Sequence, residues 1–208
     1  MKKNKKFYIV CSLAIGDGCL RQRRNTEKAE LDIAHHIKHQ DYIEYKARIM
    51  RDVGMRTNGM IKNRVGNTQY RVYSNSTYLN YCVYRKLYDN KQKIFTNGML
   101  KNLDKWSLAI LWMDDGCLSF RKSKRKDGSI YRYKFGSIAT NSFNKENNEK
   151  ILKWLEKFEI TGYLRKDNRF SEENKYSIVF NRDNVNKLIE IVSPIVKNIP
   201  SMKYKIRD

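Results

Sequence analysis

Two continuous runs of apolar residues occur along the chain, and each ends in an acidic residue and a glycine. The first is FYIVCSLAIGDG, residues 7–18, and the second is WSLAILWMDDG, residues 106–116. Both runs are too continuous for a helix with one solvent-exposed face, so they predict two buried helices. We expect these helices to end at Gly18 and Gly116, the usual C-terminal stop, and the second to begin at Asp104 as its N-cap. The simplest partner for each buried helix is the other one.

After each glycine the apolar period changes to two. The segment CLSFRK, residues 117–122, alternates apolar with polar side chains, and the segment IYRYKFGSI, residues 130–138, alternates aromatic residues with Arg132 and Lys134. Alternation of this kind predicts strands, and the intervening Asp127-Gly128 predicts a hairpin turn. We expect the aromatic residues to face the core and the cations to face outward.

The same order of elements is predicted in both halves of the chain. Further strands are expected at 19–24, 29–37, 60–65, 69–74, 162–167 and 175–180, and further helices at about 40–52, 77–88, 144–158 and 182–192. The order α-β-β-α-β-β-α therefore occurs twice. The units also end alike, in KQKI at 91–94 and KYKI at 203–206. These features predict an α+β fold of two αββαββα units, residues 1–98 and 99–208.

The charge of the chain points to a polyanionic partner. The formal net charge is +21, and both halves are basic, with 20 basic and 8 acidic residues up to position 100 and 23 and 14 after it. Such a charge favours nucleic acid as the partner, with an anionic membrane as the rival. No apolar run approaches 18 residues and no signal-peptide pattern is present, so we expect a soluble intracellular protein without a membrane partner.

The cysteine and histidine residues do not match a zinc site. The four cysteines contain no C-x-x-C pair, and the clustered histidines have no cysteines nearby; the residues are Cys11, Cys19, Cys82, Cys117, His35, His36 and His39. Free, partly buried thiols in a reducing compartment are the simpler interpretation.

The two apolar runs resemble a known motif. VCSLAIGDG at 10–18 and LAILWMDDG at 108–116 look like two copies of the LAGLIDADG motif, a nine-residue helix that ends in an acid and glycine. The second copy, followed by CLSF, IATNSF and IPSMKYKI, is similar to the single-chain homing endonucleases encoded by introns of yeast mitochondria. The resemblance implies pseudo-symmetric units packed through the two motif helices. Each unit would offer a saddle of four antiparallel strands to the DNA major groove.

The resemblance also implies an active site where the two motif helices end. Asp17 and Asp115 would be the catalytic acids and metal ligands, and Gly16 and Asp114 would be further metal-ligand positions. Asp114 is expected to act as a cap or through its backbone, because it precedes the metal-type aspartate. Lys93 and Lys205 would polarise water or stabilise the phosphate, the alternative for each being a solvated surface lysine.

A divalent metal suits these residues. Phosphodiester hydrolysis needs an activated water and cations that offset developing charge, and carboxylate oxygens suit Mg²⁺. We expect Mg²⁺ as the cofactor, Mn²⁺ as a substitute, and Ca²⁺ to bind without supporting cleavage. An isolated Asp-Gly would indicate a turn, whereas two copies after buried helices favour a catalytic site. The motif copies differ in one respect, since the small Ser12 and Gly16 of the first copy correspond to Ile110 and Asp114 in the second.

The remaining cations divide into two predicted groups. Residues expected to reach base edges are Arg21, Arg23, Arg71, Arg121, Arg132, Lys134, Arg165 and Lys175. Residues expected to contact DNA more generally, including the backbone-tracking run at 121–126, are Arg24, Lys122, Lys124, Arg125, Lys126 and Lys166. An RNA-stacking sheet is disfavoured, because the alternation assigns the aromatic residues to the core.

Together these features predict a monomeric, site-specific double-strand DNA endonuclease that hydrolyses one phosphodiester on each strand across the minor groove. Its partner would be double-stranded DNA with a long, asymmetric target, and its own intron RNA is a further candidate partner. The alternative is an RNA-splicing maturase or a DNA-binding regulator of the same fold without cleavage. Both acids are retained, which favours the enzyme, because two like charges held close together need a cation between them.

Overall fold

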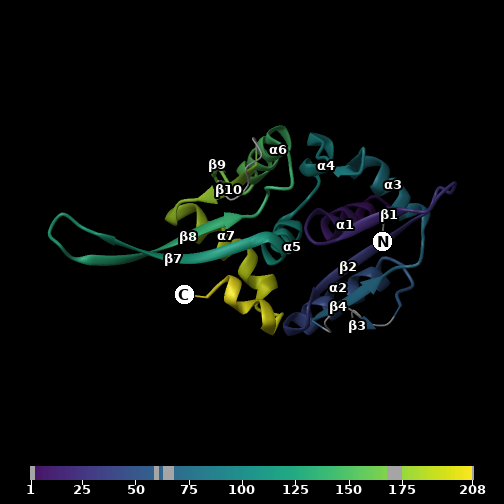
Figure 1. Cartoon of the computed structure of the whole chain (residues 1–208), viewed down its shortest axis with the longest axis horizontal. Coiled ribbons are helices and arrows are strands. Elements are labelled where there is room, and N and C mark those ends of the chain that lie inside the picture. The colour runs from purple at the N-terminus through teal and green to yellow at the C-terminus, as the bar shows by residue number, and fades with distance from the viewer. Residues whose placement is uncertain (1–2, 59–60, 63–67, 168–174, 208) are drawn as a thin grey trace.

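The computed structural model describes residues 3–58, 61–62, 68–167 and 175–207 (Figure 1). The first half contains α1 (Lys3–Ile15), β1 (Cys19–Gln22), β2 (Ala29–His36), α2 (Gln40–Asp52), β3 (Ile61–Lys62), β4 (Gln69–Tyr73) and α3 (Tyr78–Leu87). The second half contains α5 (Lys105–Asp115), β7 (Gly116–Lys124), β8 (Ile130–Ile138), α6 (Lys145–Glu156), β9 (Tyr163–Lys166), β10 (Tyr176–Phe180) and α7 (Arg182–Val196). The predicted α+β fold of two pseudo-symmetric αββαββα units is confirmed.

The two four-stranded sheets have the same topology. Their strand orders are β1-β2-β4-β3 and β7-β8-β10-β9, and all neighbouring strands are antiparallel. Figure 1 shows α1 and α5 at the centre of the molecule with one sheet on each side. Helices cover one face of each sheet, and we call the opposite face the open face. Part of the predicted strand at 60–65 lies outside the described residues.

Several short elements were not predicted. They are the 3-10 helix η1 (Ile37–His39), the strand pair β5 (Tyr88–Asp89) and β6 (Gln92–Lys93), helix α4 (Asn97–Lys101) and the 3-10 helix η2 (Pro200–Lys205). The two similar KQKI and KYKI segments therefore have different local structures, since Lys93 lies on a strand and Lys205 on a 3-10 helix. The similarity in sequence does not extend to backbone conformation.

The ends of the motif helices, α1 and α5, differ from the prediction. Helix α1 ends at Ile15, before Gly18, and α5 ends at Asp115, directly before Gly116. Neither Gly18 nor Gly116 has the positive φ of a C-terminal glycine stop. Instead, a Cβ atom would lie 2.1 Å from the Leu13 carbonyl oxygen at Gly18 and 2.3 Å from that of Trp112 at Gly116. Glycine is required there because the chain turns back closely over the preceding helical turn.

Helices α1 and α5 pack closely against each other. The Ser12 hydroxyl donates a hydrogen bond to the Ser107 hydroxyl over 2.7 Å, and Asp104 caps α5 in a capping box with Ser107, as its predicted N-cap role requires. At the far end, a Cβ atom on Gly16 would lie 2.3 Å from Oδ2 of Asp114. The small residue of one motif thus accommodates the larger residue of the other, which explains the unequal motif copies.

The β7–β8 hairpin is the longest extension of the molecule. Its strands pair from Gly116 opposite Ile138 to Lys124 opposite Ile130, and Gly128 adopts a φ of +86° in the predicted turn. It projects well beyond the other elements in Figure 1. The corresponding β1–β2 pair spans only Cys19 to Gln22 on the first strand. The two sheets therefore reach different distances from the centre.

The four cysteines are free, with Cys11 buried and Cys117 exposed. Among the described helices, none has the length and apolar character needed to cross a membrane.

Candidate active site

The C-terminal ends of α1 and α5 meet at one place, which we call the helix junction. The backbone N–H of Asp17 donates a hydrogen bond to Oδ2 of Asp114 over 3.0 Å, so the two motif ends are in direct contact. The side chain of Asp17 is 40% exposed, and Asp115 is half-buried. The structure thus brings the two predicted catalytic acids together.

The environment of the helix junction disfavours the ionised form of both Asp17 and Asp115. Burial, and then the negative charges of Asp17 and Asp114, raise the pKa of Asp115 to about 7. Burial and then the Asp114 charge raise the pKa of Asp17 as well. Negative charges held this close to one another favour the binding of a cation between them.

The two predicted lysines lie at equivalent places in the site. Lys93 Nζ donates to the carbonyl oxygens of Gly16 and Ile15 over 2.6 and 3.3 Å. Lys205 Nζ donates to those of Gly116 and Asp114 over 2.5 and 3.5 Å. Carbonyls at a helix C-terminus lack intrahelical partners and favour a cation. Each lysine therefore stabilises the end of the motif helix in its own half.

Burial lowers the pKa of both lysines, while the neighbouring aspartates oppose that shift. Lys205 is further held by its backbone, whose carbonyl accepts a hydrogen bond from Trp112 Nε1 over 2.9 Å. The same 3-10 helix is tied to the first half, because Ser201 N–H donates to Asp41 Oδ2 of α2 over 2.9 Å. The position of Lys205 thus depends on contacts to both halves.

The side chain of Asp114 has a structural environment unlike that of the two catalytic candidates. It is fully buried, and its Oδ1 accepts hydrogen bonds from Lys46 Nζ at 2.6 Å and the Tyr42 hydroxyl at 2.7 Å. Burial favours the neutral acid, but the Lys46 charge and these hydrogen bonds lower the pKa of Asp114. With Asp17 N–H on Oδ2, both oxygens are already used. The side chain of Asp114 is therefore fixed by these three hydrogen bonds, and one of its carboxylate oxygens lies within 4.8 Å of ligand atoms of Asp17 and His35.

His35 is the one residue of the predicted histidine cluster that reaches the helix junction. It is 7% exposed, with Nε2 3.1 Å from Lys46 Nζ and Nδ1 3.4 Å from Asp17 Oδ2. Burial and then the Lys46 charge lower the pKa of His35 to about 3, so the ring is neutral. By contrast, His36 accepts a hydrogen bond from Lys38 N–H, and His39 stacks on Tyr204.

Sequence reasoning missed His35, Lys46 and Tyr42 as parts of this site. One signal was present: Lys46 stands within the apolar stripe of α2, whose buried residues are Tyr42, Ile43, Lys46, Ala47 and Met50. A lysine at a core position of an amphipathic helix needs a buried anion. In this fold that anion comes from α5, which lies far away in sequence.

The open face of the first sheet carries two of the predicted base-reading arginines. Arg71 forms two hydrogen bonds to the carboxylate of Asp32, and Arg21 Nη2 lies 3.0 Å from Asp32 Oδ2. Asp32 is nearly buried, so it fixes both guanidinium groups from beneath. Since each guanidinium has five N–H donors, N–H groups that do not contact Asp32 can donate to a ligand.

On the second sheet, Arg121 and Arg165 also lie on the open face. The Arg121 guanidinium is 3.8 Å from the centre of the Phe135 ring, and that of Arg165 is 5.5 Å from it. Phe135 therefore supports both cations rather than packing in the core. The remaining predicted cations are exposed, apart from the half-buried Lys175: Arg23, Arg24, Lys122, Lys124, Arg125, Lys126 and Lys166.

The prediction that Arg132 and Lys134 lie on the outward face of the sheet is wrong. The strand register puts Lys134 opposite Phe120 and on the face of Gly136, where a Cβ would contact Val185 of α7. Arg132 and Lys134 thus belong to the helix-covered face, and the aromatic residues that alternate with them belong to the open face. Lys166 likewise alternates with Arg165 and faces the helix side. The alternation predicted the strands correctly, but it did not identify which face of the sheet the helices cover.

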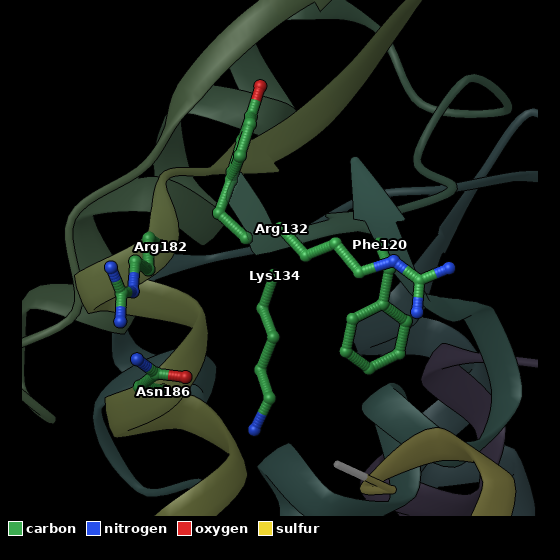
Figure 2. Close-up of a pocket in the computed structure, with 6 residues that line it drawn as sticks. Phe120, Arg132, Lys134, Arg182 and Asn186 are labelled. Atoms are coloured by element: carbon green, nitrogen blue, oxygen red, sulfur yellow. The ribbon is translucent and has the colours of Figure 1, made fainter. Parts of the chain in front are cut away.

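Arg132 and Lys134 line a hollow of about 450 Å³ beside α7. Figure 2 shows Lys134 and Phe120 in this hollow, with Arg182 and Asn186 of α7 at its edge. It lies on the opposite face of the sheet from Arg121. The hollow is therefore separate from the open face that carries the ordered arginines.

The fold and the helix junction define a class of protein with two αββαββα units that share one acidic site between paired helices. The family described as the LAGLIDADG DNA endonuclease family matches residues 7–188. The chain belongs to this family.

A curated protein is similar to almost the whole of this chain. The chain is 26% identical over 209 residues to a protein named Protein RecA from Mycobacterium shimoidei, in a match that covers 98% of this chain and 46% of that protein. It thus spans about half the length of this curated relative.

Two solved structures show the same fold. The homing endonuclease I-WcaI bound to its DNA recognition sequence has a TM-score of 0.72 at 22% identity, covering 100% of this chain and 87% of that one. I-DmoI in complex with DNA and Mn has a TM-score of 0.56 at 15% identity, covering 92% and 98%.

Proposed function

We propose that this protein is a site-specific endonuclease that cuts both strands of double-stranded DNA, with Asp17 and Asp115 as its catalytic acids. The observation that carries the proposal is that Asp17 and Asp115 lie at the converging ends of α1 and α5, where Asp17 bonds to Asp114 beside Asp115 and its charge raises the pKa of Asp115. Each carboxylate comes from one pseudo-symmetric half, which suits one phosphodiester on each strand. Membership of the endonuclease family supports the reaction class.

The donors at the helix junction fit a hard divalent cation. Asp17 and Asp115 supply carboxylate oxygens, and Gly16 and Asp114 supply backbone carbonyls that keep a second lone pair beside their lysine bonds. When bound, Mg²⁺ or Mn²⁺ would supply positive charge for the phosphate and acidify a water molecule. Ca²⁺ is proposed to bind these oxygens without supporting cleavage.

The chain's own cations would complete the chemistry. Lys93 and Lys205 are anchored at the two helix ends by backbone carbonyls, so their remaining N–H donors can order water or stabilise charge on the phosphate. The open faces would hold the DNA through ordered arginines, with Arg21 and Arg71 on one sheet and Arg121 and Arg165 on the other.

A single chain would read an asymmetric target. The first open face presents two arginines on an acid, whereas the second presents two arginines on an aromatic ring and a longer hairpin. Two unlike surfaces favour two unlike half-sites, and one chain already contains both acids. The rival, a maturase or regulator of the same fold without cleavage, has no need for two acids whose pKa values are both raised by burial and by neighbouring negative charge.

The experiment is cleavage of a randomised double-stranded DNA library. The wild-type protein with Mg²⁺ should produce cut molecules that share one sequence, and no cutting should occur with EDTA. Asp115→Asn should abolish cutting, while Asp52→Asn at the exposed end of α2 should not. A wild-type protein that enriches one DNA sequence by binding but never cuts it would support the non-cleaving rival.

A further inference from the structure

His35 connects the buried ion pair of the helix junction to Asp17. Its Nε2 is 3.1 Å from Lys46 Nζ, and Lys46 Nζ in turn is 2.6 Å from Asp114 Oδ1. Its other ring nitrogen, Nδ1, is 3.4 Å from Asp17 Oδ2. Lys46 is fully buried and His35 nearly so, which leaves little room for either side chain to turn away.

The contact with Lys46 determines which ring nitrogen of His35 accepts a hydrogen bond. An ammonium group has three donors and no lone pair, so the nitrogen that faces Lys46 must accept. Nε2 therefore carries the lone pair and Nδ1 carries the hydrogen. Nδ1 lies 3.4 Å from Asp17 Oδ2, so the carboxylate of Asp17 is the acceptor nearest to that hydrogen. In this arrangement neither ring nitrogen has a lone pair available for a metal ion.

Among the described residues of the second half, no such series of contacts occurs. The strand register makes Ile33 of β2 equivalent to Ile138 of β8, so His35 corresponds to Thr140. Helices α2 and α6 begin five residues after His35 and Thr140, respectively, which agrees with this correspondence. The Thr140 hydroxyl donates to the Tyr176 carbonyl within the sheet. Lys46 corresponds to the buried Ile151, and Asp114 corresponds to Gly16. The positions near Asp115 that correspond to His35, Lys46 and Asp114 therefore hold no histidine, lysine or acid.

We propose that His35 is a positioning residue for Asp17, that Lys46 fixes it as the Nδ1–H tautomer, and that the two catalytic halves are therefore unequal. The inference rests on the proposed function for its catalytic consequence. By donating to one oxygen of Asp17, His35 would fix the rotation of the carboxylate and leave the other oxygen directed at the metal. Asp115 would depend on the metal and on Lys205 for its orientation.

The tautomer can be measured without DNA, metal or cleavage. Long-range proton–nitrogen correlation NMR of uniformly labelled wild-type protein at pH 7.5 distinguishes a protonated Nδ1 from a protonated Nε2. The signals of His35 are identified by their loss in His35→Asn. We expect a neutral ring protonated at Nδ1. A ring protonated at Nε2, or at both nitrogens, would overturn the proposal.

The positioning role is tested by strand-resolved cleavage of the selected target. Asparagine carries its amide nitrogen on Cγ, as Nδ1 is, whereas glutamine carries it one bond further, nearer to Nε2. His35→Ala and His35→Gln should slow one strand at least tenfold relative to the other, and His35→Asn should restore the wild-type ratio. Thr140→Ala is the matched variant and should leave the ratio unchanged.

Equal slowing of both strands by His35→Ala, or failure of His35→Asn to restore the ratio, would contradict the positioning role. If the wild-type protein cuts no DNA at all, the proposed function fails, while the NMR measurement still decides the tautomer. The two failures are therefore distinguishable.

Discussion

The raised pKa of Asp115 makes the stability of the protein depend on pH. Burial, followed by the charges of Asp17 and Asp114, raises its pKa to about 7. An acid whose pKa is raised on folding stabilises the protein below its unfolded pKa, near 4, and loses that contribution as the pH rises through about 7. At pH 8, without a metal, the ionised carboxylate opposes folding.

Asp115→Asn should therefore stabilise the metal-free protein at high pH. We expect a gain of on the order of 2 kcal/mol in the free energy of unfolding at pH 8, because the buried charge is removed, and a much smaller gain at pH 5. Urea denaturation in EDTA at both pH values measures this difference. An equal gain at the two pH values would mean that Asp115 is not held in a charged cluster.

The residues of the site that sequence reasoning found are those that occur twice. Asp17 and Asp115 follow equivalent apolar runs, and Lys93 and Lys205 close equivalent units. His35, Lys46 and Tyr42 act in one half only, so the repeat could not reveal them. Their partner is a carboxylate 68 residues from Lys46 in the sequence, and only the folded chain brings the two together.

At the scale of elements, α1 and α5 define the site by their close approach. Gly16→Ala would place a Cβ 2.3 Å from Oδ2 of Asp114. We expect a loss of about 2 kcal/mol in the free energy of unfolding, since such overpacking forces the helices apart. Gly98→Ala is the control, because no atom lies within 4 Å of a Cβ there and alanine favours helix α4.

Chemical denaturation of both variants measures this effect. Gly98→Ala should be neutral or slightly stabilising. If Gly16→Ala were as stable as the wild type, the two motif helices would not be packed as closely as the contact between Asp17 and Asp114 requires.

The two faces of the β7–β8 hairpin should contribute unequally to DNA affinity. Arg121 lies on the open face over Phe135, whereas Arg132 lies on the helix-covered face beside α7. Arg121→Ala should weaken binding to the selected target roughly tenfold, the loss of one arginine–base or arginine–phosphate contact. Arg132→Ala should change it by less than about twofold. Fluorescence anisotropy at one salt concentration measures both, and the reverse ranking would place DNA on the other face.

The strands and main helices could be predicted because each long element has a clear apolar period. Their faces and ends could not be predicted so well. Phe135 has the residue type of a core position, yet it lies on the open face and supports Arg121, while the adjacent Gly136 faces the helices. Gly18 and Gly116 have the residue type of a helix stop, yet they serve close packing against carbonyls. Periodicity does not record what covers a strand or a turn.

At the scale of the whole molecule, one chain contains both halves of the site, and its helix junction is tied together from both sides. The C-terminal 3-10 helix bonds to Trp112 of α5 and to Asp41 of α2. We therefore expect one protein chain per DNA duplex in light scattering. Affinity should fall steeply with salt, because a chain of net charge +21 releases counterions from several phosphates. A two-chain complex would mean that each chain supplies only half of a site.

The central claim is that Asp17 and Asp115 together cut both strands at one shared site. Single-turnover cleavage of the selected target, with each strand labelled separately, tests it most directly for the wild type, Asp17→Asn, Asp115→Asn and the control Asp52→Asn. With Mg²⁺, the wild type and Asp52→Asn should yield double-strand breaks, and both junction variants should bind the DNA but yield none. Full double-strand cleavage by either Asp17→Asn or Asp115→Asn would contradict the claim.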